Sequence, residues 1–470
     1  MSERRFSASE LVDGVLRLLA TALLVSMGYA AWHDASKSWD VWSYHLPFAT
    51  RIAGMMDAHA YTFGAANQAR FEGFPLLAEA LQGLLVRITS RPESANLLAF
   101  GAVCAFALFL RFWRNVPPYL TWLSLMAVPL VQIHATAAYI DLAANACAAA
   151  LLLLCYGLIA DDETPSLRTV VIAGVLAAFT ANMKFQLVPI VLVASLVFVW
   201  RALARDDARS RRVLTILAFL PIVFATPIKN LVLHGNPVWP IELRLPGISL
   251  PHVEGAYASS PVWLEHASRP VRFLCSVAEI GLRPIASHHR WSLDQWAPHD
   301  SPSYRMGGFF GVYVLVNVAA LGSALFLRRS RESVVAVVFF AGVTVVTSVL
   351  PQSHELRYYL YWMILLVGLN LILWAKAAPR LVGIGSLAAL AVVAWSTGGG
   401  FLYASGDSFA DLVHAKVDSR AWSAIAPRER VCIERTPWTF LYAPAFHPEK
   451  AYSVQEAEEP SDCGTARPLD

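Results

Sequence analysis

The chain has 470 residues, of which 56% are hydrophobic and only 15% are charged, and its formal net charge is +3. A mean hydropathy of +0.49 is too high for a single water-covered surface, so the composition excludes a soluble protein and predicts a polytopic membrane protein. The small net charge and the lack of a basic stripe with interleaved aromatic residues argue against a nucleic-acid partner.

Apolar stretches long enough to cross a membrane recur along most of the chain. A spanning helix needs about 20 mostly apolar residues, and we count about eleven stretches near that length. They cover residues 11–32, 95–112, 119–134, 140–160, 169–181, 187–200, 213–228, 309–327, 334–350, 358–374 and 381–394. We therefore predict an all-α polytopic membrane fold, with a transmembrane domain over residues 1–396.

Basic residues in the short loops predict the orientation, because Lys and Arg favour the cytoplasmic side. Arg4 and Arg5 place the N-terminus inside. Alternation from there puts the loops at 111–114, 161–168, 201–212, 328–331 and 376–380 inside as well. All but 161–168 are plainly basic, and that loop ends in Arg168. Three larger regions then lie outside, at 33–93, 231–308 and 397–470. The chain has no Asn-x-Ser/Thr sequon, which fits a bacterial inner membrane with the C-terminus in the periplasm.

One apolar stretch in the first outer region, residues 74–88, is shorter than a span. It carries Glu79, Gln82 and Arg87 on the face opposite its leucines, which is typical of a helix that lies in the interface plane. The alternative is a short true span. That alternative would invert every later loop and place the basic clusters outside, so we predict the in-plane helix.

The outer tail, residues 397–470, alternates a helical pattern over 409–426 with a strand-like pattern over 430–434, and it predicts a small α/β cap. Cys432 and Cys463 both lie in this tail, and we expect a disulfide between them, since an outer compartment permits oxidation. The chain contains no Cys-x-x-Cys, His-Glu-x-x-His or Gly-rich phosphate loop, so a redox centre, a zinc peptidase or a nucleotide-driven pump has no support.

Isolated charges mark the outer membrane boundary. Asp40 follows the first span and Asp141 opens a later one, while Lys184, Lys229 and Arg357 sit at outer span ends. For each acid the alternative is a helix N-cap, and for each base it is a side chain that snorkels to the interface. Because buried charges in membranes are costly, five of them at one leaflet predict a shared polar cavity.

Such a cavity suits the displacement of a lipid phosphate by a hydroxyl or an amine. Asp40 would take the proton from the attacking group, and the cations would stabilise the departing phosphate. A single displacement with one base inverts the anomeric centre. Asp34 lies close enough to Asp40 to be a rival base.

The motifs around these charges resemble, in the family's order, those of the polyprenyl-phosphate-dependent type C glycosyltransferases, which include protein O-mannosyltransferases and the lipid A aminoarabinose transferase. They are Asp40 with Tyr44-His45-Leu46-Pro47, Gly73-Phe74-Pro75, Tyr139-Ile140-Asp141, Met183-Lys184-Phe185-Gln186, Lys229-Asn230 with Gly235-Asn236-Pro237-Val238-Trp239-Pro240, and Arg357-Tyr358-Tyr359. The resemblance implies a membrane transferase that uses a polyprenyl-phosphate-linked sugar donor.

Residue by residue, the resemblance implies that Asp40 is the first-loop catalytic acid and Asp141 a second acid that binds the acceptor or an optional divalent metal. Lys184, Arg357 and Lys229 are the candidates for the donor phosphate. The protein O-mannosyltransferases carry an acidic pair in the first loop, whereas Val41 follows Asp40 here, which leaves a protein acceptor and a metal open.

Three further residues, Trp42, Tyr44 and His45, are candidates for acceptor or sugar contacts, with interfacial anchoring as the alternative. We expect a sugar to move from the carrier to a periplasmic lipid, glycan or protein, with membrane lipids around the enzyme and no certain cofactor. The rival hypothesis is a transporter or flippase for a lipid-linked sugar, which predicts internal symmetry and charges at the membrane midplane. The sequence shows neither.

Overall fold

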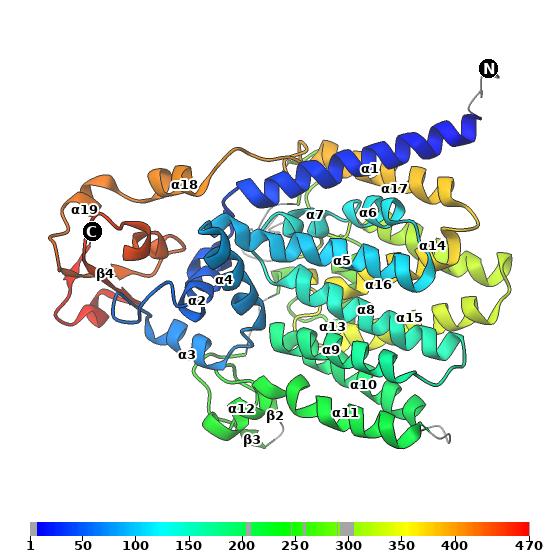
Figure 1. The fold of residues 1–470 in the computed structure, drawn as a ribbon, viewed down its shortest axis with the longest axis horizontal. Coiled ribbons are helices and arrows are strands. Elements are labelled where there is room, and N and C mark those ends of the chain that lie inside the picture. The colour runs from blue at the N-terminus through cyan, green and yellow to red at the C-terminus, as the bar shows by residue number, and fades with distance from the viewer. Residues whose placement is uncertain are drawn as a thin grey trace.

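The computed structural model describes residues 7–203, 208–245, 247–256, 260–288, 290–291 and 305–469. Figure 1 shows a large helical body in which most of the long helices run along the longest axis. The N-terminal end of the first helix and the C-terminal sheet lie at opposite ends of the molecule. The chain is thus a helical membrane body with one small sheet-containing cap.

Seven described helical segments are long and apolar enough to cross a membrane, or up to eight if one bent pair counts as a single span. Their helices are α1 (Ala8–His33), α5 (Leu97–Arg114), α8 (Asp141–Ala160), α10 (Val188–Ala202), α15 (Arg331–Val349), α16 (Leu360–Trp374) and α17 (Pro379–Ser396). A multi-pass membrane protein is therefore confirmed, whereas the predicted count of about eleven regular spans is not.

The remaining four predicted spans are helical but short or interrupted. Residues 119–134 form two short buried helices, α6 (Pro118–Met126) and α7 (Pro129–Ala135), because Pro129 cannot donate the hydrogen bond that would continue α6. Helices α11 (Arg209–Val223) and α12 (Ala225–His234) meet at 52°, close to Pro227. Helices α9 (Leu167–Met183) and α14 (Gly311–Leu327) are apolar but shorter than a full span.

Two helices form the centre of the body. Helices α8 and α16 are almost entirely buried, and α8 packs against α5, α9 and α16. The alanine-rich start of α8 allows this close packing, since small side chains let helix backbones approach. By contrast, α1 exposes most of its apolar surface, including Leu11, Leu18 and Val25. The outer helices therefore carry the lipid-facing surface. The buried helices α8 and α16 fix the positions of the residues at their ends.

The first outer region is folded and helical. It contains the π-helix η1 (Val41–His45), α2 (Leu46–Ile52), the strand β1 (Tyr61–Thr62), α3 (Ala65–Gly73), α4 (Leu77–Thr89) and η2 (Pro92–Asn96). Helix α4 matches the stretch predicted to lie in the interface plane. The polar face was expected to meet water, but two of its three residues, Glu79 and Gln82, are buried against the protein. Arg87 is exposed, as are Leu84 and Ile88 on the opposite face.

The second outer region is mostly irregular where it is described. It holds the short strands β2 (Arg244–Leu245) and β3 (Ile248–Ser249), the 3-10 helix η4 (Val262–Leu264) and α13 (Arg269–Val277). Two further 3-10 turns, η3 (Phe185–Leu187) and η5 (Leu356–Tyr359), lead directly into α10 and α16. These turns place Lys184, just before η3, and Arg357, within η5, at the outer ends of the helices.

The cap is a four-stranded parallel sheet in the order β1-β5-β4-β6, with β4 (Arg430–Glu434), β5 (Ser453–Ala457) and β6 (Arg467–Pro468). Its edge strand β1 comes from the first outer region, so the tail completes its sheet with a distant segment. The predicted helix 409–426 is divided into α18 (Phe409–Lys416) and α19 (Ser419–Ser423). The 3-10 turns η6 (Thr439–Tyr442), η7 (Pro444–Phe446) and η8 (Pro460–Cys463) complete the cap. Cys432 and Cys463 are bonded in a disulfide.

Candidate functional site

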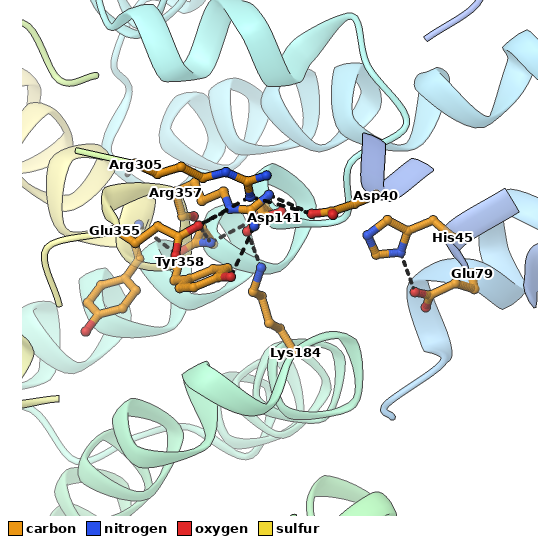
Figure 2. Close-up of polar contacts among 11 residues, drawn as sticks. Asp40, His45, Glu79, Asp141, Lys184, Arg305, Glu355, Arg357 and Tyr358 are labelled. Carbon is orange, nitrogen blue, oxygen red and sulfur yellow. Dashed lines mark hydrogen bonds and ion pairs between the residues drawn. The ribbon is translucent and has the colours of Figure 1, made fainter. Parts of the chain in front are cut away.

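Charged side chains from distant parts of the chain gather where α8 and α16 begin and α9 ends (Figure 2). Asp40 immediately precedes η1, Asp141 is the first residue of α8, and Lys184 follows the last residue of α9. Arg357 lies in η5, just before α16. Both predicted acids and two of the three predicted bases therefore lie on one side of the helical body.

Asp40 is held by two arginines. Nη1 of Arg357 donates to Oδ2 of Asp40 at 2.8 Å, and Nη1 of Arg305 lies 3.8 Å from the same oxygen. Burial opposes ionisation of this carboxyl, but Arg357, Arg305 and His45 outweigh it, so the pKa of Asp40 falls well below its usual range. Asp40 makes no side-chain capping bond, which removes the N-cap alternative.

Asp141 is held by one lysine in a drier setting. The ammonium of Lys184 donates to Oδ1 of Asp141, and the two side chains are 9% and 2% exposed. Ile140, not Asp141, occupies the N-cap position of α8, and a carboxylate in the first turn is favoured by the helix dipole. Nζ of Lys184 also lies 4.3 Å from the ring centre of Tyr358. This pair fixes the ends of α8 and α9 against each other.

Arg357 connects the two pairs. Its Nε donates to Oε1 of Glu355 at 2.7 Å, and its Nη2 donates to the Tyr358 hydroxyl at 3.1 Å. Arg305 approaches the same Glu355 oxygen at 3.5 Å. Three carboxylates thus face three cations in the cluster, namely Asp40, Asp141 and Glu355 against Lys184, Arg305 and Arg357. Its formal charge is balanced, so an entering anion must compete with a carboxylate for a cation.

Of the predicted sugar or acceptor contacts, Tyr44 and His45 lie beside this cluster. Their rings are 4.3 Å apart, and Nδ1 of His45 is 2.8 Å from Oε1 of Glu79. Burial, reinforced by the nearby charge of Asp40, raises the pKa of Tyr44 well above its ordinary value. Tyr44 is therefore a neutral hydroxyl at any working pH.

Two other predicted residues point elsewhere. Trp42 is buried, donates to the Ser36 carbonyl and stacks on Phe409 of the cap, so it packs the first outer region against the tail. Lys229 on α12 donates to the Glu72 carbonyl rather than to the acids of the cluster. The contacts described for both side chains therefore lie outside the cluster.

The rival acid Asp34 has a structural position. It follows α1, and its carboxylate accepts hydrogen bonds from the backbone N–H groups of Ser405 and Gly406. These bonds attach the end of α1 to the segment that leads into the cap. Asp34 therefore serves as a matched comparison for Asp40, six positions away in the same loop.

Sequence reasoning missed Arg305, Glu355 and Glu79. Arg305 lies four residues before an apolar stretch on the predicted outer side, so the criterion that singled out Lys184 and Arg357 applies to it too. Glu355 lies two residues before Arg357, so its place beside the predicted base was a signal in the sequence. Glu79 was predicted to lie on a water-facing helix surface. Only the packing of α4 on α2, and the contact of Glu79 with His45 of η1, show that it is buried.

Within the described ranges, no group of three or more His, Cys, Asp or Glu side chains is placed to hold a metal ion. Each predicted acid is instead bonded to a cation. The divalent metal that the family resemblance left open thus finds no ready set of ligands among these residues.

No protein-family model matches the sequence, and a comparison with curated proteins finds no match. Solved structures do match. ArnT from Cupriavidus metallidurans in the apo state is 13% identical, with a TM-score of 0.50 over 95% of this chain and 90% of that one. ArnT bound to undecaprenyl phosphate is 14% identical, with a TM-score of 0.49 over 94% and 89% of the two chains.

An Archaeoglobus fulgidus oligosaccharyltransferase in the apo form is 12% identical, with a TM-score of 0.43 over 94% of this chain and 64% of that one. The likeness to apo ArnT spans nearly the full length of both chains. The chain therefore shares the fold of ArnT, and the resemblance drawn from the motifs is confirmed at the level of the fold.

Proposed function

We propose that the chain is a membrane glycosyltransferase that moves a sugar from a polyprenyl-phosphate carrier to an acceptor on the outer face of a bacterial inner membrane. The observation that carries this proposal is the cluster in which Asp40 is bonded to Arg357 beside the Asp141–Lys184 pair. A carboxylate next to several cations suits a reaction in which a proton is removed and a phosphate leaves.

The arginines are the best-placed ligands for the donor phosphate. Arg305 and Arg357 share the partly open side of the cluster, where the Asp40 side chain is 14% exposed. A guanidinium binds phosphate oxygens in pairs. Lys184 adds positive charge behind them while it stays bonded to Asp141. Lys229 is a weaker candidate, because its ammonium already binds the Glu72 carbonyl.

Donor binding would also activate Asp40. A carboxylate whose pKa is lowered by two arginines is a poor base. When the phosphate draws Arg305 and Arg357 toward itself, Asp40 loses part of that stabilisation and its basicity increases. The order of events follows from this competition, because the proton is removed only once the donor is in place.

The transfer is a single displacement. The acceptor oxygen or nitrogen forms a bond to the anomeric carbon, its proton moves to Asp40, and the bond between the anomeric carbon and the phosphate oxygen breaks. The polyprenyl phosphate leaves with the electron pair. One attack from the face opposite the phosphate inverts the anomeric centre. Tyr44 and His45, beside Asp40, are placed to orient the acceptor.

Membranes from cells that lack the gene provide a direct test, since they retain both the unused donor and the unmodified acceptor. Purified wild-type protein added to them should attach one sugar, seen as a single mass gain by mass spectrometry. Asp40→Asn should keep the fold and lower the rate by about 10²–10⁴-fold, the usual contribution of a general base. Asp34→Asn makes the same chemical change nearby and should transfer normally. Near-normal transfer by Asp40→Asn would remove Asp40 as the base.

A further inference from the structure

A buried acid–imidazole pair, Glu79 with His45, lies next to the cluster, and its acid has no part in the transfer described above. Nδ1 of His45 is 2.8 Å from Oε1 of Glu79, and the side chains are 4% and 2% exposed. The second carboxylate oxygen of Glu79 is buried with no hydrogen-bond partner among the described residues. A buried carboxylate with so few partners is costly. Packing alone therefore does not explain why Glu79 is an acid.

The backbone of η1 brings His45 close to Asp40. In a regular α-helix, residues five positions apart point about 140° away from each other around the axis. The π-helix at 41–45, closed by the Leu46 N–H and the Val41 carbonyl, has a wider turn and reduces that angle. Such π-helical turns occur frequently at functional sites. The two side chains are accordingly close enough to interact electrostatically.

Figure 2 shows the His45 ring beside Asp40, with the nitrogen that is not bonded to Glu79 turned to the Asp40 side. An ionised carboxylate only accepts hydrogen bonds, so Glu79 requires the proton of the neutral imidazole to be on Nδ1. The lone pair of Nε2 then faces Asp40. The groups around the ring are Glu79 from α4, Tyr139 from the segment before α8, at 6.4 Å between ring centres, and Asp40 and Tyr44 from its own segment.

We infer that Glu79 is a positioning residue that holds His45 in the tautomer whose Nε2 receives the proton Asp40 has taken from the acceptor. This inference rests on the proposed transfer. The proton moves from the acceptor hydroxyl or amine to the Asp40 carboxylate, and then from the Asp40 carboxyl to Nε2 of His45. Glu79 stabilises the imidazolium that results, and the ring afterwards releases its proton to water.

The pair solves a difficulty for a base that stands among cations. Once the phosphate has left and the arginines return to Asp40, a protonated Asp40 beside them is a strong acid and must pass its proton to another group. An imidazole is ordinarily a better proton acceptor than a carboxylate. The role of Glu79 matches that of the acid behind the histidine in a catalytic triad, where it fixes the tautomer and stabilises the charged ring.

The test uses the full-length protein in lipid nanodiscs and the gene-deficient membranes as the source of both substrates. Glu79→Gln keeps the shape but removes the charge, and its amide can present either oxygen or nitrogen to the ring. We expect kcat to fall roughly tenfold to a hundredfold, with the apparent KM for the membranes within about twofold. His45→Gln should show the same loss. The double variant should be no slower than either single variant, because Glu79 acts only through His45.

Nitrogen-15 NMR of histidine-labelled protein supplies a readout that turnover does not. Wild-type His45, assigned by its loss in His45→Gln, should be the Nδ1–H tautomer, and Glu79→Gln should mix the two tautomers. The matched control is Glu449→Gln, which changes the other His–Glu pair, His447 with Glu449 at 3.7 Å in the cap. It should alter neither the rate nor the His45 signal.

Three results would overturn the relay: an Nε2–H tautomer in the wild type, full kcat in Glu79→Gln, or a double variant whose loss is the product of the two single losses. Each of these leaves the proposed transfer standing, provided the wild-type protein still modifies the membranes. If the wild-type protein transfers no sugar, the proposed function itself falls.

Discussion

The two acid–base pairs of the cluster differ in how far they can rearrange. Asp40 is 14% exposed and shares two arginines with Glu355, whereas Asp141 is 2% exposed and depends on Lys184. A partly open pair with several partners can exchange one of them for a ligand. A dry pair with a single partner cannot, because the remaining charge would be left buried. The Asp40 side is therefore suited to chemistry and the Asp141 side to holding the helix ends together.

The largest effect should come from breaking the dry pair. Asp141→Asn leaves Lys184 buried without its counterion and should lower the free energy of unfolding by about 3–5 kcal/mol. Asp40→Asn should cost far less. Thermal unfolding of the purified variants in detergent measures both.

The double variant Asp141→Asn with Lys184→Met removes both charges and should recover most of the lost stability. Equal losses for Asp40→Asn and Asp141→Asn would show that the two sides of the cluster do not differ in this way.

The link between the two sides is Asn145 on α8. Its amide nitrogen donates to the Asp141 and Arg357 carbonyls, and its oxygen accepts from the N–H of Tyr361. Asn145→Ala leaves buried backbone groups unpaired and should cost about 1–3 kcal/mol of stability. Combined with Asp40→Asn, its effect on transfer should be less than additive, because both changes act on the same Asp40–Arg357 contact; an additive loss would show that Asn145 does not align Arg357.

The open side should respond to loss of an arginine by losing affinity for phosphate. Arg305→Gln removes one charge-assisted contact and should weaken binding of undecaprenyl phosphate about tenfold. Lys229→Gln is the matched control and should change the affinity by less than about twofold. Native mass spectrometry in detergent gives both values. A larger effect at Lys229 would place the phosphate nearer α12.

The smallest effect is the acid sensitivity of the Asp40 pair. Because the pKa of Asp40 is lowered in the folded protein, the pair stabilises the fold above the ordinary carboxyl pKa and loses that contribution as the pH falls below it. The stability difference between wild type and Asp40→Asn, about 1 kcal/mol, should stay constant from neutral pH and shrink below about pH 4. A difference that already shrinks near pH 6 would indicate another titrating group.

The membrane class and the helical segments were predictable, because hydrophobic length is local in the sequence and the bilayer sets a fixed requirement. Breaks within segments were not. Pro129 lies inside an apolar stretch that reads as one span, yet the chain divides there into two short buried helices. The cap was predicted as an α/β tail, but its edge strand β1 belongs to the first outer region, and pairing between strands so far apart leaves no local signal.

The sequence by itself determined which residues are costly at a membrane boundary, since Asp40, Asp141, Lys184 and Arg357 stand out against apolar surroundings wherever the chain folds. Only the tertiary structure decided their partners. The packing of α8 on α9 brings Lys184 to Asp141, the folding of the first outer region brings Asp40 to Arg357, and the packing of α4 on α2 buries Glu79 against His45. The physical reason is that the cost of burying a charge can be inferred from the apolar residues next to it in the sequence. Its counterion comes from a distant segment, and only helix packing determines which one.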